Sequence, residues 1–97
     1  IAVAKVDHTV GRVTAAQAAD ELLNISGVDT SFVLFPDQEG RVILSARSMG
    51  DVNVQVVLEK LGGGGNAATA GAQVPNKSVD EVHQMLLQAI EEYLEDE

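Results

Sequence analysis

The 97-residue sequence contains no cysteine and no tryptophan, and its only aromatic residues are two phenylalanines and one tyrosine. Without cysteine the chain can form neither a disulfide framework nor a thiolate metal site. This composition suits a reducing compartment, and we expect a cytoplasmic protein. No apolar run approaches the roughly 20 residues of a membrane-spanning helix, and no signal-peptide pattern is present. We therefore expect this segment to make no membrane contact.

Basic residues are also scarce, since six Lys and Arg stand against 15 Asp and Glu, for a net charge of −9. Proteins that bind long nucleic acids usually carry a basic stripe, because phosphate contacts dominate that affinity. Few aromatic residues are available for stacking on bases. We expect no long duplex nucleic acid as a partner, and any anionic ligand must be held by a few local donors.

The length and the hydrophobic fraction of 45% fit one domain with a modest core. The chain opens on "IAVAKVD", which lacks a methionine and has the pattern of a buried strand. We therefore expect residues 1–97 to be a single domain that belongs to a longer protein.

The first half of the chain predicts a strand, a helix and a hairpin. Residues 1–7 form the strand pattern, and Thr14 with Gln17 fits a capping box that begins a helix. Two alternating apolar runs then flank "PDQEG", residues 36–40, which holds turn-forming Pro, Asp and Gly.

The second half predicts a helix, a strand and a helix. Residues 50–62 fit both periods, and we favour a helix capped by Asp51 and ended by Gly62. "AGAQVP" predicts a short strand, and Ser78 with Glu81 fits a second capping box. The buried stripe of the last helix is Val79, Val82, Leu86, Ala89, Ile90 and Tyr93. The expected fold is an α/β domain with a mixed sheet packed against helices, in the order β-α-β-β-α-β-α.

Residues suited to catalysis are few. The histidines are His8 and His83, and neither belongs to a set of ligands with metal-site spacing. Asp7 and His8 form a lone pair, which is far more often a strand cap than a metal site. No histidine stands near Ser45 or Ser48 in the sequence to act as a base. We expect no catalytic residue and no cofactor site in this chain.

The stretch "LGGGGNAATAGAQ", residues 61–73, places four glycines in a row. It matches neither the phosphate loop of nucleotide triphosphatases nor the dinucleotide fingerprint. Glycine allows a ligand to approach the backbone closely, whereas a helix cap needs only one glycine and a linker usually contains serine. The run therefore favours a ligand loop over a plain connector.

The stretch "SARS", residues 45–48, offers a second group of donors. A guanidinium between two hydroxyls suits a phosphate, and the predicted helix start that follows also favours anions. The alternative is that Arg47 pairs with Asp51 or another local acid, and the local sequence slightly favours this alternative.

Together, "ILSARSMGDVNVQVVLEKLGGGGNAATAGAQV" is similar to the DHHA1 domain, which follows the catalytic DHH domain in DHH-family phosphoesterases. That family has S-x-R-S on a strand, then a helix, a G-G-G-H motif and an Ala/Gly-rich strand. The sequence most resembles the C-terminal part of the membrane-anchored, GdpP-type cyclic-di-AMP phosphodiesterases of Gram-positive bacteria. Asn66 stands where the family has its histidine, and Asn cannot carry a positive charge.

The resemblance implies that this chain recognises the substrate, while a separate DHH domain holds two metal ions, usually manganese, and hydrolyses it. The expected partners are therefore that DHH domain and a cyclic dinucleotide or short oligonucleotide, and the parent protein would be membrane-anchored with this domain in the cytoplasm. The implied substrate-binding residues are Ser45, Arg47, Ser48, Gly62, Gly63, Gly64, Gly65 and Asn66, with Thr69 and Gln73 as weaker candidates.

Three alternatives stay open at this point: a nucleotide sensor without enzymatic activity, an RNA-binding module, and the substrate domain of an oligoribonucleotide phosphodiesterase. A homodimer is also open. The low aromatic content and the acidic charge argue against RNA binding.

Overall fold

The structure is a computed structural model that describes residues 1–6, 12–24 and 27–96. Its elements, in chain order, are β1 (Ala2–Lys5), α1 (Arg12–Leu23), β2 (Thr30–Pro36), β3 (Arg41–Ser48), α2 (Val54–Glu59), β4 (Gly64–Gly65), β5 (Thr69–Pro75) and α3 (Val79–Asp96). The strands form one mixed sheet in the order β1-β2-β3-β5-β4, in which only β1 and β2 run parallel. This confirms the predicted α/β fold.

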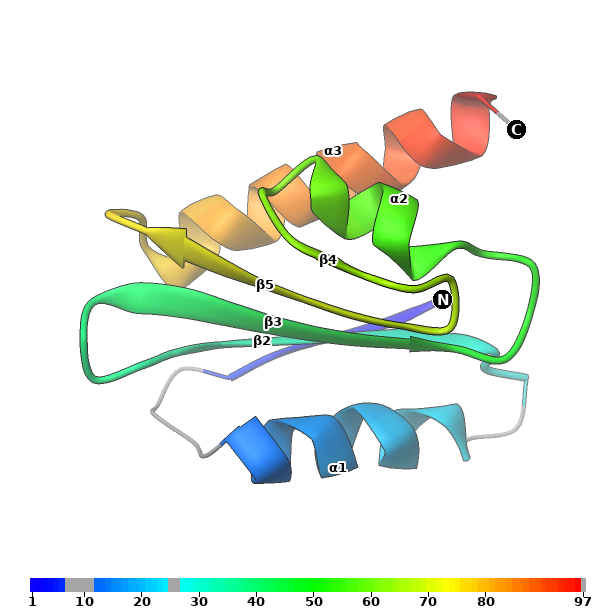
Figure 1. Ribbon diagram of the computed structural model, residues 1–97, viewed down its shortest axis with the longest axis horizontal. Coiled ribbons are helices and arrows are strands. Elements are labelled where there is room, and N and C mark those ends of the chain that lie inside the picture. Colours follow the sequence, from blue (N-terminus) through cyan, green and yellow to red (C-terminus); the bar gives the residue numbers. More distant parts are fainter. Residues whose placement is uncertain (7–11, 25–26, 97) are drawn as a thin grey trace.

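Helices cover both faces of the sheet, as Figure 1 shows, with α1 on one face and α2 and α3 on the other. The main core lies between the sheet and the α2–α3 layer, where Phe32, Leu34 and Leu44 meet Leu58 and Leu86. A smaller core lies under α1 and contains Ala19, Val33, Phe35 and Ile43. None of the helices in the described ranges is long and apolar enough to cross a membrane.

The predicted hairpin is confirmed, because β2 and β3 pair antiparallel from Thr30–Ser48 to Pro36–Val42. Asp37 closes the turn: its Oδ1 accepts the backbone N–H groups of Glu39 and Arg41, each at 2.9 Å. This is the local side-chain-to-backbone bonding that makes Asp a turn residue.

The capping predictions had mixed outcomes. The box that begins α3 is confirmed, because Ser78 Oγ accepts the Glu81 N–H at 3.1 Å and Glu81 Oε1 accepts the Ser78 N–H at 3.0 Å. The Thr14 cap is wrong, because α1 already begins at Arg12. The Asp51 cap is also wrong, because α2 begins later and Asn53 accepts the Val56 N–H instead.

The glycine at the end of α2 was predicted correctly. Gly62 has a φ of 84° and donates its N–H to Glu59, while Gly63 donates to Leu58. This pair of bonds is the Schellman arrangement, in which glycine is the favoured residue at the left-handed position.

Beyond that cap lies an element that the sequence did not predict. Gly64 and Gly65 form the short edge strand β4, which pairs antiparallel with β5. The glycine run is therefore part of the sheet, beside the Ala/Gly-rich strand that follows it.

Candidate functional site

The two faces of β3 have different roles. Leu44 and Ala46 point into the main core, whereas Ser45 and Arg47 alternate with them on the opposite face. That opposite face is the one on which α1 packs, over β2 and β3. We call it the α1 face.

Small residues line up across the α1 face, beside the helix. Ser45 of β3 pairs with Gly71 of β5, and Gly71 pairs with Gly64 of β4. Directly opposed residues of antiparallel strands point to the same side of the sheet. These three positions therefore form a row with almost no side-chain bulk.

An open groove of about 540 Å³ lies along this row. We call it the glycine groove. Its lining residues are Ile43, Leu44, Ser45, Gly62, Gly63, Gly64, Gly71, Ala72 and Gln73. The structure thus brings Ser45, Gln73 and most of the glycine run to one place, although they come from separate segments of the chain.

The glycines of this run differ in their structural surroundings. A Cβ on Gly63 would lie 2.3 Å from the Gly71 carbonyl oxygen, and one on Gly65 would lie 2.4 Å from the Thr69 carbonyl oxygen. Neither glycine can therefore carry a side chain where this segment approaches β5. A Cβ on Gly64 would meet nothing within 4 Å, so Gly64 is the strand residue that leaves the groove open.

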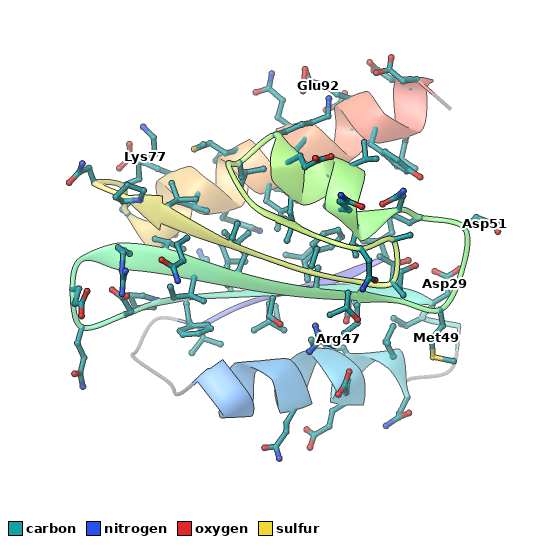
Figure 2. The ribbon with its side chains drawn as sticks, in the orientation of Figure 1. Asp29, Arg47, Met49, Asp51, Lys77 and Glu92 are labelled. Atoms are coloured by element: carbon teal, nitrogen blue, oxygen red, sulfur yellow. The ribbon has the colours of Figure 1, made fainter. Side chains whose placement is uncertain are left out.

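Arg47 extends from β3 toward α1, as Figure 2 shows. Its Nε donates to Asp20 Oδ1 at 3.1 Å, and its Nη1 donates to the Ala46 carbonyl at 2.9 Å. The partner is thus an acid on another element, and not Asp51. Within the described residues no bond of Nη2 is found. A guanidinium carries five N–H groups, so Arg47 keeps donors for an anion.

Ser48 and the start of α2 lie away from Arg47. The Ser48 side chain is buried on the other side of the sheet, within 3.3 Å of Thr30 Oγ1 and of the Gly50 nitrogen. Helix α2 also packs on that side, so its N-terminus does not join Arg47 in one anion site as the sequence led us to expect.

Asn66 is occupied by the turn between β4 and β5. Its Oδ1 accepts the N–H groups of Ala68 and Thr69, each at 2.9 Å, and its own N–H donates to the Thr69 carbonyl. Thr69 is exposed and pairs with Arg47, so it is on the α1 face.

Gln73 contacts a basic residue that the sequence did not single out. Arg41 Nη1 donates to Gln73 Oε1 at 3.2 Å. Asp20, Arg41 and Gly71 were all missed, because their proximity to the groove depends on strand register and on the packing of α1. The sequence feature that could have identified Gly71 is its position in the small-residue stretch "TAGAQ", shortly after the glycine run.

The described residues include no group of three or more His, Asp or Glu that could hold a metal ion. Asp7 and His8 lie outside the described residues. His83 is half-buried on α3, on the far side of the sheet from the glycine groove.

The family model described as "DHHA1 domain" matches residues 1–96. Among curated proteins, the cyclic-di-AMP phosphodiesterase GdpP of Geobacillus thermodenitrificans is 50% identical over 97 residues, covering 98% of this chain and 15% of that protein. The cyclic-di-AMP phosphodiesterase PdeA of Listeria monocytogenes is 43% identical over 93 residues, covering 96% of this chain and 14% of that protein. The chain thus spans about a seventh of these relatives.

Solved structures share the fold at low identity. An exopolyphosphatase-related protein from Bacteroides fragilis superposes with a TM-score of 0.77 at 23% identity, covering 94% of this chain and 29% of that one. The C-Ala domain of alanyl-tRNA synthetase from Aquifex aeolicus superposes with a TM-score of 0.62 at 18% identity, covering 87% and 86%.

Proposed function

Because the chain belongs to the DHHA1 domain family, we propose that it is the substrate-binding domain of a phosphodiesterase that hydrolyses cyclic-di-AMP. The observation that carries this proposal is the glycine groove, where Ser45, Gly71 and Gly64 leave a flat, open stretch of backbone. The high identity to two proteins named as cyclic-di-AMP phosphodiesterases supports the choice of substrate.

The donors at this face suit a nucleotide. Ser45 offers a hydroxyl within the groove, and Arg47 follows two positions along β3 on the same face. An exposed ion pair is worth only about 0–1 kcal/mol, so a phosphate can replace Asp20 as the partner of Arg47 at small cost. A bidentate contact to phosphate is stronger than that pair.

In this proposal the chemistry belongs to a DHH domain in the same protein, as the family resemblance implies. Two metal ions there, usually manganese, would activate the water that attacks the phosphodiester. The present chain binds and orients the nucleotide, as one domain covering residues 1–97. Its cytoplasmic location stays a prediction.

The decisive experiment compares Arg47→Ala with Asp20→Ala in the full-length protein. Loss of a hydrogen bond to a charged group costs about 1.5–3 kcal/mol, so Arg47→Ala should weaken cyclic-di-AMP affinity about 10- to 150-fold. Asp20→Ala breaks the same ion pair but leaves the guanidinium in place. It should therefore keep the wild-type affinity or improve it.

Equal effects of the two variants would show that Arg47 acts only through the ion pair, and would contradict the proposal. Binding of cyclic-di-AMP without hydrolysis by the full-length protein would favour a sensor instead. The 97-residue chain alone, supplied with manganese and cyclic-di-AMP, should give no turnover, because its described residues lack a metal cluster.

A further inference from the structure

Arg41, at the start of β3, is held by the hairpin turn. Its Nε donates to Asp37 Oδ2 at 2.8 Å, and its Nη2 lies 3.0 Å from Glu39 Oε2. Desolvation acts to raise the pKa of Asp37, but hydrogen bonds from Arg41 and Glu39 and the charge of Arg41 lower it below the ordinary 3.8. Asp37 is therefore charged at neutral pH, when it pairs with the Arg41 guanidinium.

The remaining guanidinium nitrogen of Arg41 contacts a side chain that lines the glycine groove. Nη1 donates to Gln73 Oε1 at 3.2 Å, and Gln73 is one of the groove-lining residues. A guanidinium only donates hydrogen bonds, so the amide atom that faces it must be the carbonyl oxygen. The amide nitrogen of Gln73, with its two N–H groups, then faces away from Arg41.

This hydrogen bond favours one orientation of the Gln73 amide on an exposed side chain. A free glutamine can exchange its oxygen and nitrogen by a half-turn of the terminal torsion, and so match opposite patterns of donors and acceptors. Here a half-turn would place the N–H groups of Gln73 against the N–H groups of Arg41. The contacts of Arg41 with Asp37 and Gln73 thus favour one pattern of donor and acceptor at this end of the groove.

The Gln73 amide lies on the same face as Arg47 but farther along β5. Arg47 pairs with Thr69, and Gln73 follows Thr69 by four residues along β5, a distance of about 13 Å at the rise of a strand. A cationic end for phosphate and an amide end for a base are therefore arranged along one face of the sheet. A dinucleotide can span both.

We propose that Gln73 forms hydrogen bonds with the purine base of the substrate, an inference that rests on the proposed function. Arg41 is the positioning residue that makes Gln73 select adenine over guanine. On its Watson–Crick edge, adenine presents the N6 donor beside the N1 acceptor, which matches one orientation of a glutamine amide in a bidentate contact. On the same edge guanine presents the acceptor O6 beside the donor N1–H, which is the opposite pattern. To satisfy guanine, the Gln73 amide would have to give up its hydrogen bond with Arg41 and place its N–H groups against the guanidinium.

The test measures the affinity of the full-length protein for cyclic-di-AMP and cyclic-di-GMP. Gln73→Glu keeps an oxygen for Arg41 but replaces the N–H donor by a second acceptor, so cyclic-di-AMP affinity should fall about 5- to 150-fold. Gln88→Glu, which adds the same charge on an exposed position of α3, is the matched control and should leave affinity unchanged.

Arg41→Met tests whether Arg41 holds the Gln73 amide in one orientation. It should reduce the ratio of the two affinities at least fivefold, chiefly by improving cyclic-di-GMP binding, because the amide can then turn over. Lys77→Met removes the same charge from an exposed loop residue and should leave the ratio unchanged. Since a purely structural role of Arg41 would lower the thermal midpoint without changing the ratio, the ratio is the decisive measurement.

The inference is overturned if Gln73→Glu binds cyclic-di-AMP as the wild type does, or if folded Arg41→Met keeps the wild-type ratio. Either result leaves the proposed function intact provided that Arg47→Ala still loses affinity. A wild-type protein that binds neither dinucleotide overturns both proposals.

Discussion

Replacing Gly64 by alanine separates ligand binding from stability more cleanly than any other change in the glycine run. A Cβ at this position meets nothing within 4 Å, and its φ lies outside the left-handed region that favours glycine. Alanine at a compatible glycine position stabilises a protein by about 0.4–1 kcal/mol, through a smaller entropy of the unfolded chain. Gly64→Ala should therefore raise the thermal midpoint slightly or leave it unchanged.

The same methyl group would stand in the row that leads from Gly64 to Ser45. A group bound flat on this backbone would have to shift by about the radius of a methyl, so we expect cyclic-di-AMP affinity to fall at least tenfold, or roughly 1.4 kcal/mol. Loss of affinity with unchanged stability is the result expected for a glycine whose missing side chain leaves room for a ligand.

Gly63→Ala and Gly65→Ala provide the contrast, because their Cβ atoms would lie 2.3 and 2.4 Å from backbone oxygens of β5. Overpacking of this kind typically costs about 1–3 kcal/mol. Both variants should therefore lower the thermal midpoint, measured by differential scanning calorimetry or circular dichroism.

Titration of each purified variant with cyclic-di-AMP gives the affinities. Normal binding by Gly64→Ala would refute the argument that this backbone touches the ligand. Unchanged midpoints for Gly63→Ala and Gly65→Ala would refute the steric account of β4.

Two further predictions concern stability. The Tyr93 hydroxyl accepts the Asn53 N–H at 2.9 Å beside the start of α2, in a part-buried hydrogen bond. Tyr93→Phe should therefore lower the free energy of unfolding, measured by chemical denaturation, by about 0.5–1.5 kcal/mol, and an unchanged free energy would contradict this. Hydrogen bonds from Ser78 lower the pKa of Glu81 from 4.5, so Glu81 stabilises the fold above that pH and loses this contribution as pH falls through its lower folded pKa. Glu81→Ala should therefore be less stable than the wild type at pH 7, with the gap closing below pH 4.5, and a gap constant from pH 7 to pH 3 would contradict this.

The elements predicted correctly from the sequence are those set by neighbours in the chain. The turn around Asp37, the box of Ser78 and Glu81, and the cap at Gly62 all use hydrogen bonds between residues two to five apart. Such bonds leave a local pattern that can be recognised. The family resemblance added the location of the candidate site.

The site's internal geometry could not be predicted in the same way. Asp20 and Arg47 are 27 residues apart, and Arg41 and Gln73 are 32 apart, so each contact exists only after α1 docks and the strands pair in register. Strand β4 was missed because two glycines carry no alternation of apolar and polar side chains. The Asp51 cap failed because Asn53, two residues on, offered the same chemistry.

Asn66 has a structural role at the position where the family resemblance places a histidine. Its side-chain oxygen already accepts two backbone N–H groups in the turn before β5, so it serves the loop and adds no positive charge. With a net charge of −9, the chain as a whole repels a cyclic dinucleotide at long range. If the proposed function is correct, binding depends on short-range donors. Among the described residues, Arg47 is a basic side chain on the α1 face whose Nη2 forms no bond and could contact a phosphate. The exposed Asp20 pairs with that guanidinium in the absence of ligand. Because an exposed ion pair contributes little free energy, a phosphate can displace Asp20.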